Sequence, residues 1–199
     1  MKKIFVAFYF MSVFFISENA IAALGLPDNT ARLGYSLSLT RLNVDDPEGN
    51  TQAAYALQPF KFIYTDWKRS GNRLWLELFY QDAVLKATDT DVGQRFKHQG
   101  VNLIVQKNLR INSAVRPWIG LGLGLSIADS KKRHTVDDEG YLLKSYPNRR
   151  NESFGMLLSV VNEWQISREW TVGGNFLHRV TLNQSIAESS LSAYFLIRY

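Results

Sequence analysis

The feature that most constrains the fold is a strict alternation of apolar residues with small or polar ones, repeated in several segments. It is clearest over residues 118–127, where glycines and a serine occupy one parity and the other holds Ile119, Leu121, Leu123, Leu125 and Ile127. A period of two places the apolar residues on one face of a β-strand. A soluble barrel packs large side chains inside, whereas a narrow membrane barrel turns them toward lipid and fills its lumen with small and polar groups. The small residues opposite leucine therefore favour a membrane barrel.

The same alternation predicts eight strands, at about residues 32–40, 53–66, 73–81, 101–106, 118–127, 154–164, 170–180 and 190–199. The connections between them alternate long and short, and the long ones cover residues 43–50, 82–100, 128–152 and 181–189. Short turns on one side and long loops on the other are typical of an up-and-down membrane barrel, in which an even number of strands brings both termini to the side of the short turns. The sequence therefore predicts an all-β fold, an eight-stranded antiparallel up-and-down transmembrane β-barrel.

Two further patterns make this prediction more specific. The apolar parity of the second strand changes at Gln58 and Pro59, and because proline cannot donate a ladder hydrogen bond, we predict a β-bulge there. Tryptophan prefers membrane interfaces. We therefore predict an aromatic girdle at the short turns, formed by Trp67, Trp75, Trp118, Trp164 and Trp170 and joined by Tyr199.

The first 22 residues are predicted to be a cleaved signal peptide, which leaves residues 23–199 as the barrel domain. Lys2 and Lys3 precede an apolar stretch, and Ala20 and Ala22 supply the small residues that a signal peptidase reads. Later in the chain no apolar run approaches the roughly 20 residues that a spanning helix needs. Cysteine is absent, which excludes disulfides, thiolate metal sites and a lipid-modified cysteine. We expect neither a metal site nor a cofactor.

Together these features resemble the small eight-stranded barrels of the Gram-negative outer membrane, the class of the outer membrane protein A transmembrane domain and of outer membrane proteins X and W. The resemblance is carried by the leader, the strand and loop rhythm, the glycine-rich segment entered through Arg116, Pro117 and Trp118, and the terminal aromatic. It implies a bacterial outer membrane location with both termini in the periplasm, and contact with outer membrane lipids and lipopolysaccharide. It also implies a signal for the barrel assembly machinery, carried by Phe195, Ile197 and Tyr199. We expect a monomer.

Inward parity places five charged residues in the lumen: Arg73, Glu77, Glu163, Arg179 and Arg198. Charges in a narrow interior must pair, because desolvating an unpaired charge costs several kcal/mol. They form either a plug of ion pairs or a polar path for small solutes. The interior of an eight-stranded barrel is just wide enough for side chains, which favours the plug.

The third long loop carries the densest positive charge, in Lys131, Lys132, Arg133, Arg149 and Arg150. Lysine and arginine pair well with phosphates, so these residues are candidates for binding lipopolysaccharide; the alternative is solvated loop charge. The chain has a net charge of +5, but its other lysine and arginine residues are scattered over turns and loops, which argues against nucleic-acid binding.

An enzymatic interpretation comes from two kinds of small outer membrane barrel that act on lipid A, a deacylase and a palmitoyltransferase. His178, Ser185 and Glu188 are the candidate catalytic residues, but the deacylase resemblance would require serine at the position of Val180. The leading interpretation is therefore a non-enzymatic barrel that presents external loops for surface interaction or supports envelope integrity. A lipid A acyl-modifying enzyme and a narrow channel remain the alternatives.

Overall fold

The computed structural model describes residues 31–69, 71–109, 117–182 and 186–198. Every regular element in these ranges is a β-strand, and none of these residues forms a helix long and apolar enough to cross a membrane. The expected leader at residues 1–22 lies outside the described residues, as do residues 110–116 and the terminal Tyr199. The strands are β1 (Arg32–Asp45), β2 (Thr51–Arg69), β3 (Asn72–Leu85), β4 (Gly93–Asn108), β5 (Trp118–Val136), β6 (Leu142–Tyr146), β7 (Arg149–Gln165), β8 (Trp170–Thr181) and β9 (Ile186–Arg198).

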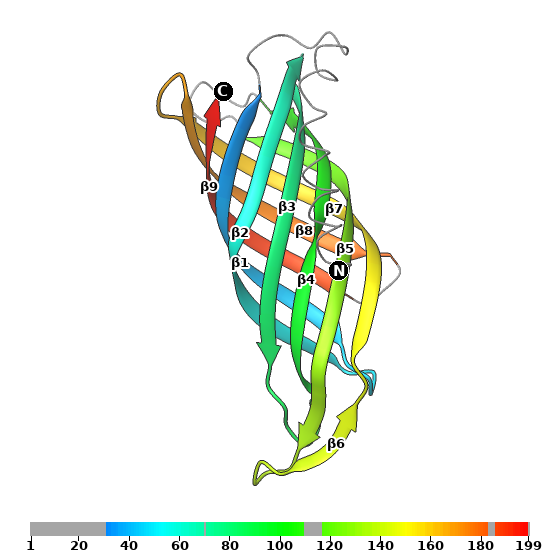
Figure 1. Cartoon of the computed structure of the whole chain (residues 1–199). Helices are drawn as coiled ribbons and strands as arrows, with labels where there is room; N and C mark the ends of the chain where they lie inside the picture. The colour runs from blue at the N-terminus through cyan, green and yellow to red at the C-terminus, as the bar shows by residue number, and fades with distance from the viewer. Residues whose placement is uncertain (1–30, 70, 110–116, 183–185, 199) are drawn as a thin grey trace, which may run out of the picture. The chain divides into compact units, whose positions relative to one another are not determined.

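Eight of these strands close into an antiparallel up-and-down barrel, as the sequence predicts (Figure 1). Each strand pairs with its neighbours in the order β1, β2, β3, β4, β5, β7, β8 and β9, and β9 pairs with β1. Among the described strands, the short β6 pairs only with β5. The end of β5, β6 and the start of β7, residues 131–150, form a hairpin that extends beyond the rest of the barrel. We call this the hairpin end, and the opposite end, where β1 begins and β9 finishes, the terminus end.

The outer wall carries the leucine-rich parity and the inner wall carries the small and polar residues. On β1, Leu37 and Leu39 are 48% and 56% exposed, whereas Ser36 and Ser38 are buried. The same arrangement holds on β5, where Leu121 and Leu123 are exposed and Gly120 is buried. An exposed apolar band around a polar interior is the pattern of a membrane barrel.

Toward the hairpin end the two faces exchange character. On β1 the buried residues become Leu42 and Val44, while Arg41 is exposed on the outer face. On β3 the buried residues become Ala83 and Leu85. The inward side chains at this level form one cluster, here called the apolar layer: Leu42, Val44, Ala54, Ala56, Ala83, Leu85, Phe96, Ala128 and Ile186.

The apolar layer explains why the long connections are shorter than the sequence analysis predicts. Residues 82–100 were expected to form a loop, yet β3 continues to Leu85 and β4 begins at Gly93. Likewise, much of the expected loop 128–152 belongs to β5, β6 and β7. Here the strands pack as in a soluble barrel, with apolar residues inside, and this second core extends the sheet beyond the membrane segment.

The predicted bulge in β2 is confirmed. Ser36 pairs with Lys61 and Ser38 pairs with Gln58, so two residues of β2 lie opposite one residue of β1. Buried positions accordingly change from even numbers before the bulge to odd numbers after it. The bulge turns Lys61 into the lumen.

The predicted tryptophan girdle is only partly correct. Trp164 and Trp170 are exposed on the outer face near the terminus end, but Trp75 and Trp118 are buried inside the barrel. The prediction for these two residues was wrong because nearness to a turn does not decide the face; strand parity does, and both lie on inward positions. The side chain of Trp67 is outside the described part of the chain.

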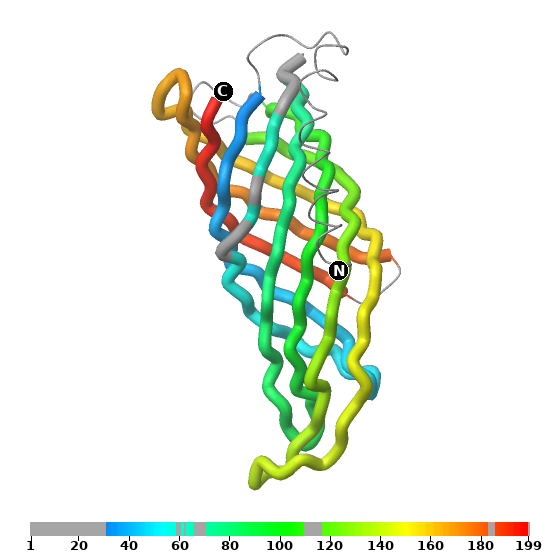
Figure 2. Tube along the Cα trace, viewed as in Figure 1, coloured from blue at the N-terminus to red at the C-terminus, as the bar shows by residue number. Residues whose placement is uncertain are grey.

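One junction of the barrel is incompletely paired. The ladder between β2 and β3 runs from the Arg69 and Asn72 pair to the Phe60 and Tyr80 pair and, within the described residues, goes no further toward the hairpin end. Beyond that point the two strands diverge (Figure 2). We call the boundary between residues 51–58 of β2 and residues 81–85 of β3 the seam.

Candidate functional site

The lumen of the membrane segment contains a polar band between two apolar regions. The apolar layer bounds the band toward the hairpin end. Toward the terminus end lies a second buried cluster: Ile63, Trp75, Ile104, Trp118, Leu157, Val161, Leu177, Tyr194 and Leu196. The middle of the polar band therefore lies between apolar side chains on both sides.

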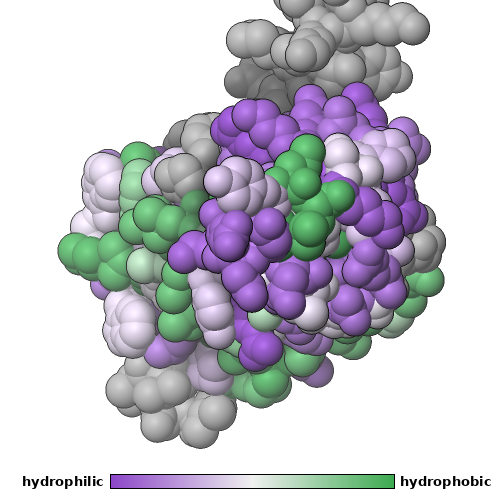
Figure 3. All heavy atoms as spheres, turned by 90° about the horizontal axis from the view of Figure 1, so that it is seen from below, coloured by the Kyte–Doolittle hydropathy of each residue, from purple (hydrophilic) through white to green (hydrophobic). Residues whose placement is uncertain are grey.

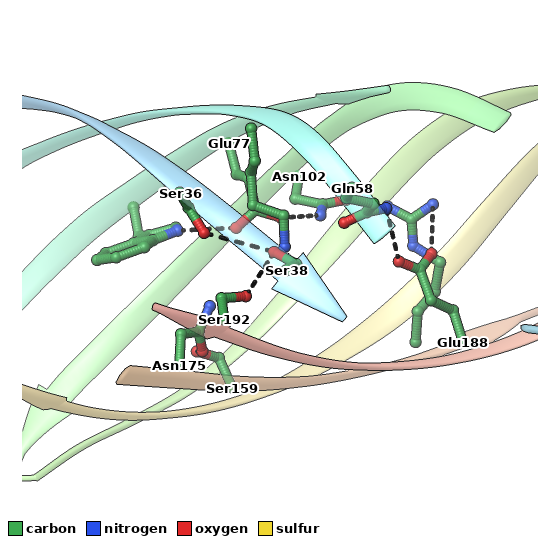
Figure 4. A network of polar contacts seen from close by, with 12 residues as sticks. Ser36, Ser38, Gln58, Glu77, Asn102, Ser159, Asn175, Glu188 and Ser192 are labelled. Carbon is green, nitrogen blue, oxygen red and sulfur yellow. Dashed lines mark hydrogen bonds and ion pairs between the residues drawn. The ribbon is translucent and has the colours of Figure 1, made fainter. Parts of the chain in front are cut away.

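Glu77 is the centre of one group of contacts in this band (Figure 4). Its Oε1 lies 3.2 Å from Nζ of Lys61 and accepts a hydrogen bond of 2.9 Å from Nδ2 of Asn102. Its Oε2 accepts a 3.4 Å bond from the Trp75 indole. Lys61 and Glu77 are almost fully buried, so each charge depends on the other for compensation.

A second group forms around Arg179, whose guanidinium donates to Oδ1 of Asn102 and lies 4.3 Å from the centre of the Phe79 ring. Nη1 of Arg179 is 3.9 Å from Oε2 of Glu188, and Nδ1 of His98 is 3.6 Å from the same oxygen. Asn102 therefore links this group to Glu77.

A third group lies nearer the terminus end, around Arg73. Nη1 of Arg73 is 2.5 Å from Oε1 of Glu163, and its Nε donates to Oε1 of Gln106 at 2.6 Å. The guanidinium also stacks 4.1 Å from the ring centre of Trp118. Glu163 accepts a further bond of 2.9 Å from the Tyr194 hydroxyl, so the carboxylate is held from two sides.

Four of the five expected lumen charges are thus inside the barrel, in linked or neighbouring groups. Arg198 is exposed at the end of β9 and joins none of the contacts described above. The sequence analysis missed Lys61 and His98. His98 was assigned to a loop, although the inward alternation of Phe96, His98 and Asn102 was a signal for its place in β4. No group of histidine, cysteine and carboxylate residues suited to a metal ion occurs among the described residues.

The hairpin carries four of the five expected loop cations on two paired strands, and Nε of one of them, Arg150, lies 3.8 Å from Oδ1 of Asp129. Across the ladder Ser130 pairs with Arg149, so Lys131 and Lys132 continue β5 next to Arg149 and Arg150 at the start of β7. All four side chains are exposed. Figure 3 looks onto this end of the barrel and shows hydrophilic side chains across much of it, with smaller hydrophobic patches among them.

Arg133, the fifth expected cation, serves the structure of the hairpin instead. The residue is only 7% exposed, and its Nη1 donates a 3.0 Å hydrogen bond to the carbonyl of Pro147. Its pKa is lowered, mainly by burial and then by Arg149. Its parity points inward, so it cannot meet a ligand on the outer surface together with Lys131 and Lys132.

The hairpin is tied to the connection between β1 and β2. Glu48 accepts a hydrogen bond from the Tyr146 hydroxyl and one of 3.1 Å from Nζ of Lys144. These bonds, that from Tyr146 first, lower the pKa of the Glu48 carboxyl, which therefore stays ionised at neutral pH. Side-chain bonds to Glu48 thus fix the position of the hairpin, in addition to the backbone hydrogen bonds of its own ladder.

Two of the three candidate catalytic residues, His178 and Glu188, lie on opposite faces of the barrel wall. Ser185 lies outside the described residues. His178 faces outward, whereas Glu188 is buried in the lumen, although their backbones lie on adjacent strands. Nδ1 of His178 instead lies 2.9 Å from Oγ of Ser189.

Of the three residues expected to signal assembly, Phe195 lies on the outer face. Its ring centre is 6.3 Å from that of Tyr35 and 6.1 Å from that of Trp170, so it joins an aromatic patch near the terminus end. Ile197 is half-buried, and Tyr199 is outside the described part.

No family model and no curated protein sequence matches this chain. Among solved structures it resembles Neisserial surface protein A, with 11% identity and a TM-score of 0.57 over 85% of this chain and 97% of that one. It also resembles Ail, the attachment invasion locus protein of Yersinia pestis, with 9% identity and a TM-score of 0.55 over 87% and 100%. OprG of Pseudomonas aeruginosa gives 11% and 0.51 over 85% and 94%. The chain therefore has the fold of the small bacterial outer membrane barrels, as its sequence suggests.

Proposed function

We propose that this membrane barrel is a non-enzymatic surface protein of the bacterial outer membrane, with both termini in the periplasm and the hairpin end outside. Its function is to present the hairpin to anionic glycans, with lipopolysaccharide as the first candidate. The observation that carries the proposal is the exposure of four cations, Lys131, Lys132, Arg149 and Arg150, on neighbouring strands of a hairpin that extends beyond the barrel.

The filled lumen supports a surface function over transport. The polar band consists of paired charges, the apolar layer covers it toward the hairpin end, and the second buried cluster lies between the pair of Lys61 and Glu77 and the pair of Arg73 and Glu163. A solute moving along the axis would have to break buried ion pairs and displace the apolar layer. The structure therefore gives the narrow-channel alternative no specific support.

The anionic character of the ligand follows from the chemistry of the hairpin. Lysine and arginine bind phosphate and sulfate through charge-assisted hydrogen bonds. Ail, which shares this fold with a TM-score of 0.53 and 9% identity, has been solved in complex with the heparin analogue sucrose octasulfate. That complex shows that a barrel of this shape can hold a polyanion.

Replacing Lys131, Lys132, Arg149 and Arg150 with glutamine is expected to weaken binding of lipopolysaccharide and of sucrose octasulfate by roughly tenfold or more. Each charge-assisted hydrogen bond contributes about 1.5–3 kcal/mol before solvent screening reduces it. The measurement is titration calorimetry of the purified barrel in detergent at two salt concentrations. A matched variant that exchanges lysine for arginine and arginine for lysine at the same positions should retain most of the affinity.

Neutralising Lys107 and Arg168, which are exposed near the terminus end, serves as the control and should leave binding unchanged. Equal affinities for the wild type and the four-glutamine variant would contradict the proposal. So would equal losses in that variant and the control.

The contact between His178 and Ser189 supports a second candidate, an acyl hydrolase that acts on lipid A. A serine hydroxyl bonded to an imidazole is the core of a nucleophilic pair, and this one is half-buried on the outer face. If it is catalytic, expression of the wild type should remove an acyl chain from lipid A in mass spectra, and Ser189→Ala should abolish that change. Identical spectra with and without the wild-type protein would exclude this activity.

A further inference from the structure

The seam is the place where the wall of the barrel lacks a continuous ladder. Residues 51–58 of β2 remain paired with β1, and residues 81–85 of β3 remain paired with β4. Within the described residues, the edges that these two segments turn toward each other have no strand partner. A hydrogen bond between the side chains of Gln58 and Gln81 bridges the seam at its narrow end.

The seam is apolar on both sides of the wall. On the outer face Tyr55, Leu57 and Val84 are 70%, 59% and 74% exposed. On the inner face the middle of the seam carries alanine, the smallest apolar side chain, at Ala54, Ala56 and Ala83, while Gln58 and Gln81 lie at its narrow end. An apolar surface therefore continues from the lipid-facing wall through the seam to the apolar layer.

Two buried glutamines lie at the hairpin-end edge of the apolar layer, where Gln52 pairs with Val44 and Gln94 pairs with Leu85. Gln52 is two residues from Ala54 on β2, and Gln94 is two residues from Phe96 on β4; both side chains are more than nine-tenths buried. The amide nitrogen and oxygen of each have no hydrogen-bond partner in the described structure. Buried polar atoms are nearly always hydrogen-bonded, so four unpartnered atoms beside the apolar layer point to a partner that is not part of the chain.

We propose that the seam binds a single-chain acyl amphiphile with an uncharged, hydrogen-bonding head. The acyl tail lies along the alanines between β2 and β3, against the apolar layer, and the head meets Gln52 and Gln94. Each carboxamide offers a donor and an acceptor, which suits a hydroxyl or amide head better than a charged one that only donates or only accepts. This site is separate from the exposed cations of the hairpin and does not depend on them.

A single chain fits the seam better than a two-chain lipid. The outer apolar strip is narrow, because Asp82 lies two residues from Val84 on the same face of β3 and is paired with Arg95. A second acyl chain beside the first would lie against this ion pair.

Because the chain contains no cysteine, the variant Val84→Cys allows a single polarity-sensitive fluorophore to be attached at the seam. The full barrel in detergent is titrated with monolaurin, a single-chain glycerol ester. The expected result is a saturable blue shift as the tail displaces water and detergent from the seam. Dodecane, lauric acid at neutral pH and a two-chain phosphatidylethanolamine serve as comparison ligands and should bind about tenfold more weakly or not at all.

Two sets of variants distinguish the seam from general binding to the apolar belt. Ala54→Trp fills the inner side of the seam and should abolish saturable binding, whereas Ala53→Trp, at the exposed neighbour on the other face, should not change it. Gln52→Leu with Gln94→Leu should lower the affinity for monolaurin by about tenfold to a hundredfold but leave that for dodecane unchanged. If Ala54→Trp does not fold, as judged by loss of the mobility shift on boiling, Ala56→Leu replaces it.

Some outcomes would overturn the proposal. These are non-saturable partitioning of monolaurin, equal effects of the variants at Ala53 and Ala54, or tighter binding of the two-chain lipid than of monolaurin. Equal affinity of the glutamine double variant would refute the assignment of the head group to Gln52 and Gln94.

Discussion

Replacing Glu77 with alanine is expected to lower the free energy of unfolding by about 3–5 kcal/mol, because the change leaves a buried charge without its partner. Nζ of Lys61 is 3.2 Å from Glu77 and has no hydrogen-bond partner among the described residues apart from this ion pair. Asn102 and Trp75 also lose the acceptor to which their nitrogens donate. The measurement is reversible urea unfolding in lipid vesicles, followed by tryptophan fluorescence.

A double variant separates the cost of the lone charge from the loss of packing. Lys61→Met combined with Glu77→Met removes both charges and keeps apolar volume in the lumen, so it should recover most of the stability. If the single and double variants unfold at the same urea concentration, the charge of Lys61 is compensated elsewhere and the described pairing is not what stabilises the band.

Replacing Arg73 with methionine is expected to destabilise the barrel by a similar amount, about 3–5 kcal/mol. Glu163 would lose its ion pair, Gln106 its donor and Trp118 the cation stacked on its ring. Arg73→Lys should lie between methionine and the wild type, because lysine keeps the charge but lacks the planar group that bonds and stacks at once. Because Trp118 reports on this contact, both variants should also change its emission in the folded state.

Arg168→Met, in the exposed turn between β7 and β8, is the matched control and should change stability by less than about 0.5 kcal/mol. If Arg73→Met costs no more than this control, the buried group around Arg73 contributes nothing net. Stability at that end of the lumen would then come from the apolar side chains of the second buried cluster.

The architecture could be predicted because its main determinant is local. Alternation on β1 and β5 sets which residues face lipid, and the strand count follows from the turns between them. The lengths of the strands could not be predicted, since the predicted strands end at residues 40 and 81, whereas Leu42 and Leu85 lie beyond these ends and belong to the apolar layer on the inner face. A rule that places polar residues inside fails at the level where the barrel leaves the membrane.

The lumen site could be predicted in part of its membership but not in its pairing. Parity alone places Arg73 and Glu77 inside, and the bulge at Pro59 also gives Lys61 an inward position. Which charge meets which depends on the stagger of the strands around the barrel, and the sequence does not show that stagger. Contacts such as Arg73 with Glu163, 90 positions apart in the chain, required the three-dimensional structure.

The exchange of faces along the strands has a consequence for how the barrel is held in the bilayer. With the hairpin end outside, as proposed, moving the barrel inward along its axis would carry Arg41 and Asp82 on the outer wall into hydrocarbon, and moving it outward would expose Leu39 and Leu125 to water. Either displacement costs several kcal/mol for each charge or apolar side chain that is moved. The free energy of the barrel therefore rises steeply on both sides of one axial position. A bilayer of different thickness would have to deform around the protein. The boundary between the polar band and the apolar layer therefore sets both the depth of the barrel in the bilayer and the height of the hairpin above the membrane surface.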